Sequence, residues 1–167
     1  MILETSCQGI DSSTVSPGLL RLDGHWLIVL DHDLRCSLPE EGCALLLGER
    51  HGSQLCLRWV WPCLNRWQPE PEQDSTASRR NRFSIDPGEL VAAQRWGRER
   101  GWLLLGSAHS HPSGAVIPSA MDLAWGWDGC LMLIRGYAPE AWGMWWLSGE
   151  QDQLEALPLP WTQVLGK

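Results

Sequence analysis

The spacing of apolar residues in the first third of the chain predicts one helix followed by a hairpin. From Asp23, a typical N-cap residue, apolar residues recur at helical spacing to about Arg35. The apolar run 43–47 predicts a short strand, and the polar residues 48–52 predict a turn. Residues 54–61 alternate as the second strand of the hairpin. That strand would offer a sheet edge to which an extended peptide could add.

The remaining two thirds of the chain alternate between polar segments and short apolar runs. Residues 68–82 hold two prolines and many charged residues, which predicts a loop and leaves open whether it closes as a lid. Residues 83–85 predict a short strand, and Asp86 opens a helix that reaches about Arg100. The apolar run 102–109 predicts a buried strand. The last predicted elements are a short helix at 119–125 and strands at 130–134 and 142–147.

This order of elements predicts one α/β domain over residues 19–150, a mixed-sheet sandwich with helices on the sheet faces. A chain of 167 residues is long enough to bury a core of ordinary size in one domain. Residues 1–18 are rich in small polar residues and predict a loose N-terminal segment. Residues 151–167 contain two prolines and predict an irregular C-terminal tail.

The amino-acid composition argues against several classes of protein for this chain. A hydrophobic content of 44% with 20% charged residues is typical of a globular chain, and neither a membrane span nor an export signal is visible. The net charge of -7 argues against a nucleic-acid binder, which relies on basic groups. The six cysteines form no Cys-x-x-Cys pair, so we expect reduced thiols in a cytoplasmic protein. The arginines at 79, 80 and 82 predict a solvated stretch or a patch that steers an acidic partner.

Two histidines and a nearby carboxylate predict a metal site at the end of the buried strand. His109 and His111 are two residues apart, so on a strand their rings project from the same face. Asp122 follows a Pro-Ser turn and can return as a third ligand. Two nitrogens, one oxygen and an open fourth position are the ligand set of a catalytic zinc ion.

Two local alternatives remain beside this hypothesis. Ser119 and Asp122 also fit a capping box at the start of a helix. Starting the helix is compatible with a catalytic role for Ser119, whereas capping and metal ligation compete for Asp122. The acidic and histidine residues 31–33 could form a second ligand cluster, but neighbours on a helix point in different directions, which favours solvated side chains.

The spacing of these residues resembles a known signature. The pattern His-x-His-x7-Ser-x2-Asp is similar to that of the JAMM, or MPN+ (JAB1/MPN/Mov34), metalloproteases, and the likeness runs over about residues 24–147. The chain is most similar to the short bacterial members that stand alone. The resemblance implies a JAB/MPN domain related to the cytidine-deaminase fold. The matching residues are His109, His111, Ser119 and Asp122.

The resemblance also implies a glutamate upstream of the metal site. Glu41 lies at the position of the family's glutamate, and Ala44 stands where the family usually has glycine. The extra methyl group of Ala44 could disturb the glutamate and lower the rate. Glu40 and Glu49 are the neighbouring alternatives, and the family pattern favours Glu41.

By this resemblance the protein is a zinc-dependent peptidase or isopeptidase. Zn²⁺ held by His109, His111 and Asp122 would activate a water molecule, Glu41 would move its proton, and Ser119 would donate a hydrogen bond to the oxyanion. The implied substrates are amide bonds after the Gly-Gly tail of ubiquitin-like or sulfur-carrier proteins.

Two other functions remain within the same fold. A non-catalytic MPN scaffold would usually have lost its ligands, and this chain keeps the full set. A RadC-like protein would usually carry a DNA-binding helical module, which neither the sequence nor its acidic charge suggests. A zinc deaminase is disfavoured, because the His-x-Glu and Pro-Cys-x-x-Cys motifs of that class are absent.

Overall fold

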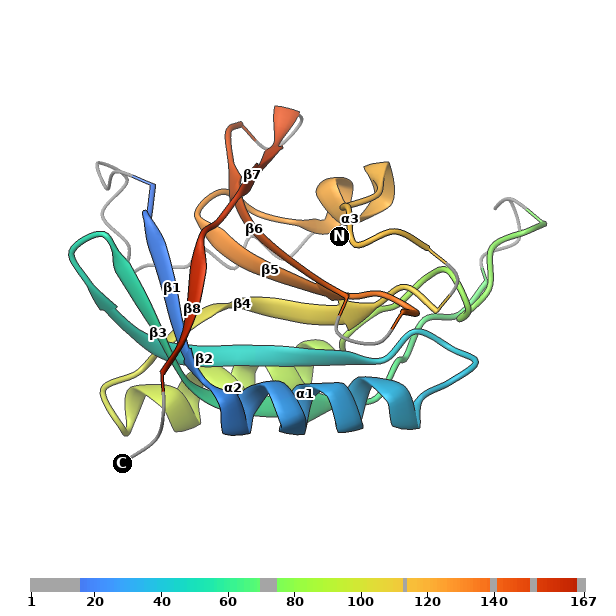
Figure 1. Cartoon of the computed structure of the whole chain (residues 1–167). Coiled ribbons are helices and arrows are strands. Elements are labelled where there is room, and N and C mark those ends of the chain that lie inside the picture. Colours follow the sequence, from blue (N-terminus) through green and yellow to red (C-terminus); the bar gives the residue numbers. More distant parts are fainter. Residues whose placement is uncertain (1–15, 70–74, 113, 139–140, 151–152, 165–167) are drawn as a thin grey trace.

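The computed structural model describes residues 16–69, 75–112, 114–138, 141–150 and 153–164 (Figure 1). The helices are α1 (Gly24–Cys36), α2 (Pro87–Arg98) and α3 (Ala120–Trp125). The strands are β1 (Leu19–Asp23), β2 (Cys43–His51), β3 (Gln54–Cys63), β4 (Leu103–Ser110), β5 (Cys130–Arg135), β6 (Trp142–Ser148), β7 (Glu155–Pro158) and β8 (Trp161–Val164). In the described ranges these strands form one curved mixed sheet in the order β7-β6-β5-β4-β2-β3-β1-β8.

Both long helices begin where the sequence predicts. The Asp23 carboxylate accepts a hydrogen bond of 3.0 Å from the backbone N–H of His25 and caps α1. Asp86 caps α2 in the same way, accepting from Gly88 N–H at 2.7 Å. Gly101 follows α2 with a φ of +71°, which turns the chain into β4. Within the described ranges, none of the three helices is long and apolar enough to span a bilayer.

The two long helices cover opposite faces of the sheet. Successive side chains of β2 point to opposite sides, so Leu46 packs in the main core with Leu30 and Leu34 of α1. Leu45 points the other way and packs with Ala93 of α2. The predicted α/β architecture with helices on the sheet faces is therefore confirmed, while the relation to cytidine deaminases stays a prediction.

Two local predictions are wrong, and one strand was missed. The predicted turn at 48–52 is mostly strand, because residues 48–51 continue the ladder of β2 with β3 and the chain reverses only at Gly52. Residues 83–85 form no strand, although the Ser84 carbonyl accepts a backbone hydrogen bond from Arg66 N–H at 2.8 Å. Strand β1 was not predicted, and residues 1–15 of the predicted N-terminal segment lie outside the described residues.

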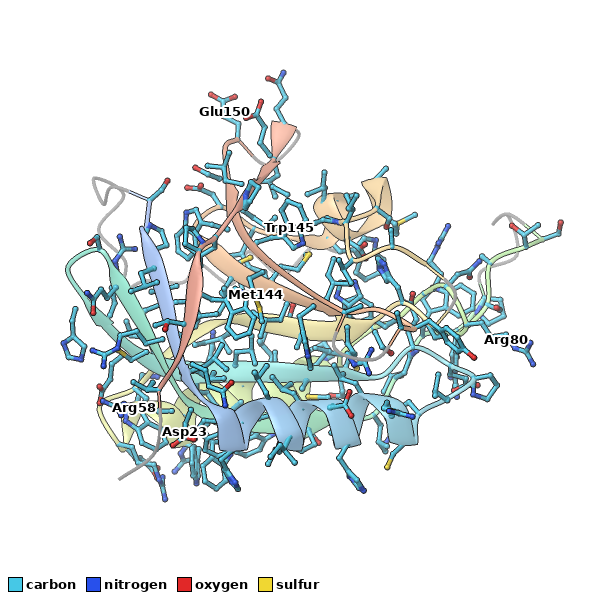
Figure 2. All side chains as sticks on the ribbon, in the orientation of Figure 1. Asp23, Arg58, Arg80, Met144, Trp145 and Glu150 are labelled. Carbon is cyan, nitrogen blue, oxygen red and sulfur yellow. The ribbon has the colours of Figure 1, made fainter. Side chains whose placement is uncertain are left out.

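The predicted irregular tail 151–167 instead supplies two strands at opposite ends of the sheet. Strand β7 pairs with β6, and β8 pairs with β1. The link between them passes through Leu159, which is buried in the main core and whose N–H bonds the Met144 carbonyl at 2.9 Å. Figure 2 shows Met144 inside the curve of the sheet. The tail thus joins the two ends of the sheet.

The edge that the hairpin was expected to offer is partly covered. Strand β1 pairs in parallel with residues 54–56 of β3, so the start of β3 lies inside the sheet. The prediction of a free edge along 54–61 is therefore wrong for its first residues, because β1 was not recognised in the sequence. A peptide therefore cannot add to the sheet beside residues 54–56.

An ion pair between buried Arg135 and half-buried Asp31 joins α1 to the end of β5. The Arg135 side chain is buried, and its Nε donates to Asp31 Oδ1 at 2.5 Å. Its Nη1 donates to the carbonyls of Gly136 and Ala138. Asp31 is therefore not merely solvated, and that expectation from the sequence is wrong. The pair links residues 104 positions apart, which no local pattern reveals.

We expect Asp31→Ala to lower the free energy of unfolding by about 2 kcal/mol, because it leaves the buried guanidinium of Arg135 without its anion. The matched control is Arg35→Ala. Arg35 also lies 3.8 Å from Asp31 but is exposed, so its loss should cost about 0.5 kcal/mol or less. Urea denaturation of both variants measures the difference, and equal losses would show that Arg135 does not depend on Asp31.

Candidate metal centre

The three predicted ligands converge where β4 ends and α3 begins. The Nε2 atoms of His109 and His111 lie 3.0 Å apart. Asp122 Oδ1 lies 3.4 Å from His109 Nε2, and Asp122 Oδ2 lies 3.3 Å from His111 Nε2. One ligand atom from each residue can be chosen so that all lie within 4.8 Å of one another. The structure thus brings the three residues together as predicted.

His109 is the most enclosed ligand. Its side chain is fully buried, and its ring stacks on Phe83 with centroids 4.6 Å apart. Burial lowers the pKa of His109, because the charged imidazolium would lose its water, although Asp122 opposes this. Its Nδ1 is buried and has no hydrogen-bond partner among the described residues. His109 is therefore held in the neutral form that can bind a cation.

A backbone carbonyl orients His111. Its Nδ1 lies 2.7 Å from the carbonyl oxygen of Ala115, and because a carbonyl only accepts, Nδ1 carries the proton. The lone pair of neutral His111 then lies on Nε2, which faces His109 and Asp122. Burial works to lower the pKa of His111, but the Asp122 carboxylate, the Ala115 carbonyl and Glu41 together raise it.

Asp122 both caps α3 and faces the two histidines, although the sequence suggested that capping and metal ligation would compete. Its Oδ2 accepts a hydrogen bond of 2.7 Å from Ser119 N–H, and its own N–H donates to Ser119 Oγ at 3.2 Å, which completes a capping box. The same carboxylate faces both imidazoles, since its two oxygens can accept several partners. Burial would raise the pKa of Asp122, but His109, His111 and the Ser119 amide hold it well below its usual range.

Glu41 lies in the segment between α1 and β2, and its side chain is only 5% exposed. Burial raises its pKa to about 7, and the charge of Asp122 also raises it, whereas His111 and Arg82 lower it. Glu41 is thus within the electrostatic field of two of the clustered residues. A carboxyl group with a pKa near 7 can both accept and return a proton at neutral pH.

Asn65 is a site residue that the sequence did not indicate. Its Nδ2 donates to the carbonyls of Glu41 at 3.0 Å and Arg82 at 2.9 Å. Its Oδ1 accepts from the backbone N–H groups of Trp67 and Ser84. One side chain therefore ties the Glu41 segment to the loop that carries Phe83. Of these bonds, only the one to Trp67 joins residues close in the sequence. It forms an Asx-turn, which is the one feature of Asn65 that sequence analysis could have detected.

The described part of the predicted loop, residues 68–69 and 75–82, contains no helix or strand, so that prediction is confirmed there. Its arginines differ from one another. Arg79 is tied down, because its Nε donates to the Trp67 carbonyl at 2.9 Å and its own carbonyl accepts from Glu41 N–H at 2.7 Å. Arg80 is exposed, and its side chain points outward from the molecule (Figure 2). The arginine run is therefore only partly a solvated stretch.

Ala44 does not crowd the site. Its side chain is fully buried and belongs to the main core, on the same face as Leu46. The neighbouring Leu45 points to the opposite face. The methyl group that replaces the family's usual hydrogen therefore packs into the hydrophobic core. Cys43, beside it, is likewise buried, with a pKa raised to about 12 mainly by burial, and behaves as a small apolar residue.

The three clustered residues fit a divalent metal ion. Two imidazole lone pairs 3.0 Å apart repel each other unless a proton or a cation lies between them, and a carboxylate completes the set. The lowered pKa of His109 disfavours a proton on that ring, whereas the raised pKa of His111 shows that its ring favours a positive charge at the same place. Nitrogen and carboxylate oxygen donors suit several first-row divalent ions. His111 is the partly exposed member, so one side of the cluster can be reached.

Comparisons with known proteins identify the family and the fold of the chain. The family described as prokaryotic homologues of the JAB domain matches residues 25–152. The solution structure of protein DSY2949 from Desulfitobacterium hafniense is 27% identical, with a TM-score of 0.69 over 87% of this chain and 94% of that one. A protein from Salinibacter ruber, 23% identical, has the same fold, with a TM-score of 0.58 over 85% and 91% of the two chains. No curated protein shows significant similarity. Because the family match covers most of the chain, including the metal cluster, the protein belongs to the prokaryotic homologues of the JAB domain.

Proposed function

We propose that the protein is a zinc-dependent peptidase that hydrolyses the amide bond after the C-terminal Gly-Gly tail of a ubiquitin-like or sulfur-carrier protein. The observation that carries the proposal is the convergence of His109, His111 and Asp122, with the buried carboxyl group of Glu41 in the electrostatic field of His111 and Asp122. Membership of the JAB-domain family supports the same chemistry. A scaffold protein has no need for three converging ligands at a cost in buried polar groups.

The residues around the cluster have separate tasks in this reaction. A divalent ion held by His109, His111 and Asp122 would supply a Lewis acid for a water molecule and for the substrate carbonyl. Glu41, a buried carboxyl group, accepts a proton from the attacking water and returns it to the leaving amine. Water is the nucleophile, so no covalent link to the protein forms.

Ser119 is available to bind the oxyanion. Its Oγ already accepts the N–H of Asp122, which leaves the hydroxyl hydrogen free to donate. The side chain is exposed, so a substrate can reach it. A donor of this kind contributes about 3 kcal/mol to stabilising the tetrahedral intermediate. Capping the helix and binding the oxyanion therefore use different parts of one hydroxyl group.

The test is cleavage of a carrier fusion. We expect the protein loaded with one equivalent of Zn²⁺ to cut fusions after the second glycine of a Gly-Gly tail, as followed by mass spectrometry. Chelation should stop the reaction and Zn²⁺ should restore it. The matched control is a fusion with Ala-Ala in place of Gly-Gly, which should remain intact. A protein that binds stoichiometric metal but cuts no carrier fusion would favour the scaffold function instead.

A further inference from the structure

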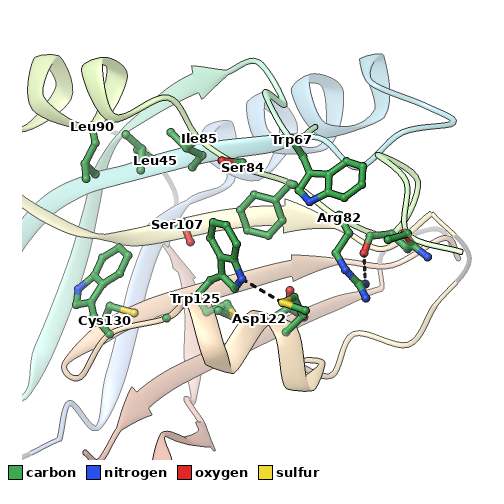
Figure 3. A pocket seen from close by; sticks show the side chains of 17 residues that line it. Leu45, Trp67, Arg82, Ser84, Ile85, Leu90, Ser107, Asp122, Trp125 and Cys130 are labelled. Carbon is green, nitrogen blue, oxygen red and sulfur yellow. Dashed lines mark hydrogen bonds between the residues drawn. The ribbon is translucent and has the colours of Figure 1, made fainter. Parts of the chain in front are cut away.

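An apolar cavity of about 380 Å³ opens beside the metal cluster (Figure 3). Its floor is the sheet face that also carries α2, and its walls come from α3 and the loop before α2. Figure 3 shows Trp67 and Trp125 projecting from different segments of the chain around the cavity, with Asp122 near Trp125. The residues that define it are Leu45, Trp67, Phe83, Trp125, Trp127 and Met132.

Two residues make the cavity continuous with the metal centre. Asp122 lines the cavity and is one of the three clustered ligands. Phe83 also lines it, and the Phe83 ring stacks on the ring of His109 at 4.6 Å. A group bound in the cavity therefore lies next to the metal cluster.

The size and chemistry of the cavity select its occupant. A cavity of about 150 Å³ is enough to bind benzene, so this one accommodates a phenyl or indole group. Aromatic walls favour an aromatic occupant, because offset and edge-to-face ring pairs add to the burial of apolar surface. The alkyl stem of a lysine is too thin to fill this space. Arg82 is the one cation among the lining residues, and it opposes an ammonium group.

We propose that this cavity binds a bulky apolar side chain, preferably aromatic, of the residue that follows the scissile bond. The inference rests on the proposed function, since a Gly-Gly tail has no side chain that could fill the cavity. Water adds to the glycine carbonyl carbon, the C–N bond breaks, and the α-amine of the aromatic residue leaves with the proton that Glu41 returns. The substrate is then a carrier with a linear C-terminal extension and not a lysine-linked conjugate.

Binding to the metal-free protein tests the cavity without turnover. We expect the acetylated peptide amide Gly-Gly-Phe to bind at least about tenfold more tightly than Gly-Gly-Ala, as measured by NMR titration. Trp125→Ala should remove most of this preference, and because Trp125 is 60% exposed, the variant should still fold. The matched control is Trp161→Ala on β8, a tryptophan 41% exposed outside the cavity, which should keep the preference.

Cleavage by the zinc-loaded protein separates this inference from the proposed function. Carrier fusions with phenylalanine after Gly-Gly should show kcat/KM at least about tenfold higher than fusions with alanine or an isopeptide-linked lysine. Cleavage without that preference, or tighter binding of the peptide Phe-Gly-Gly-Ala than of Gly-Gly-Phe, would overturn the inference and leave the proposed function standing. Selective binding of Gly-Gly-Phe with no cleavage of any fusion would sink the proposed function and keep the cavity as an aromatic site.

Discussion

Glu41→Gln is expected to lower turnover of a carrier fusion by about 10²- to 10⁴-fold while the metal content stays the same. Glutamine keeps the size of the side chain but cannot accept a proton. Glu41 lies outside the group of three clustered ligands, so the metal should remain bound. Steady-state kinetics of the zinc-loaded variant, with elemental analysis of the same sample, measure both quantities.

The matched control for this variant is Glu40→Gln. Glu40 is adjacent in the sequence but partly exposed, and its carboxylate lies 3.8 Å from Arg79. Its loss should leave turnover within about twofold of the native value, because an exposed ion pair contributes little. Release of the metal from Glu41→Gln would instead make Glu41 a ligand and overturn its role as proton acceptor.

The raised pKa of Glu41 adds a second readout to the same variant. The folded metal-free protein holds the Glu41 proton up to about pH 7, whereas the unfolded chain loses it near the ordinary value of 4.5. Glu41 therefore costs stability as the pH rises from about 4.5 to about 7. Glu41→Gln removes this cost. We expect the metal-free variant to be more stable than the native protein by about 2–3 kcal/mol at pH 8, and equally stable at pH 4, in urea denaturation.

Asp122→Asn is expected to weaken Zn²⁺ binding at least about hundredfold, since even partners that only support a ligand change affinity by 10- to 100-fold. The asparagine oxygen can still accept the Ser119 N–H, so the start of α3 should survive. The variant thus removes the charge of the ligand and keeps the cap. Competition with a metal-binding dye measures the affinity, and circular dichroism measures the helix content.

The control for this variant is Ser119→Ala, which removes a capping interaction of α3 and keeps all three metal ligands. It removes the hydroxyl that caps the Asp122 N–H, which should cost about 0.5–2 kcal/mol of stability. Its Zn²⁺ affinity should remain near the native value, because the three ligands are untouched. Unchanged Zn²⁺ affinity in Asp122→Asn would show that the carboxylate serves α3 alone.

The metal cluster was predictable because its determinants are short in range. A period of two on a strand places His109 and His111 on one face, and the three-residue spacing of Ser119 and Asp122 sets a capping box. Both patterns act within a few residues and do not depend on the rest of the fold. The helices that begin at Asp23 and Asp86 were predictable for the same reason.

The features that the sequence did not reveal depend on distant partners. Strands β1, β7 and β8 have four or five residues each, too few to show a clear period, and form because the sheet offers them an edge. Residues 48–51 remain strand because β3 pairs with them. The pair of Asp31 with Arg135, and the bonds of Asn65 other than that to Trp67, join residues that are 17 to 104 positions apart. The aromatic cavity likewise assembles from segments spread along the chain.

The two C-terminal strands have a further consequence for how the molecule behaves in solution. An uncovered strand presents a row of unpaired backbone groups to which another copy of the chain can attach. Strand β7 shields β6, β8 shields β1, and each shielding strand has only four residues. Such short edge strands offer few backbone groups with which a strand of a second molecule could pair. The segment that joins the two ends of the sheet thereby also protects the protein from edge-to-edge aggregation.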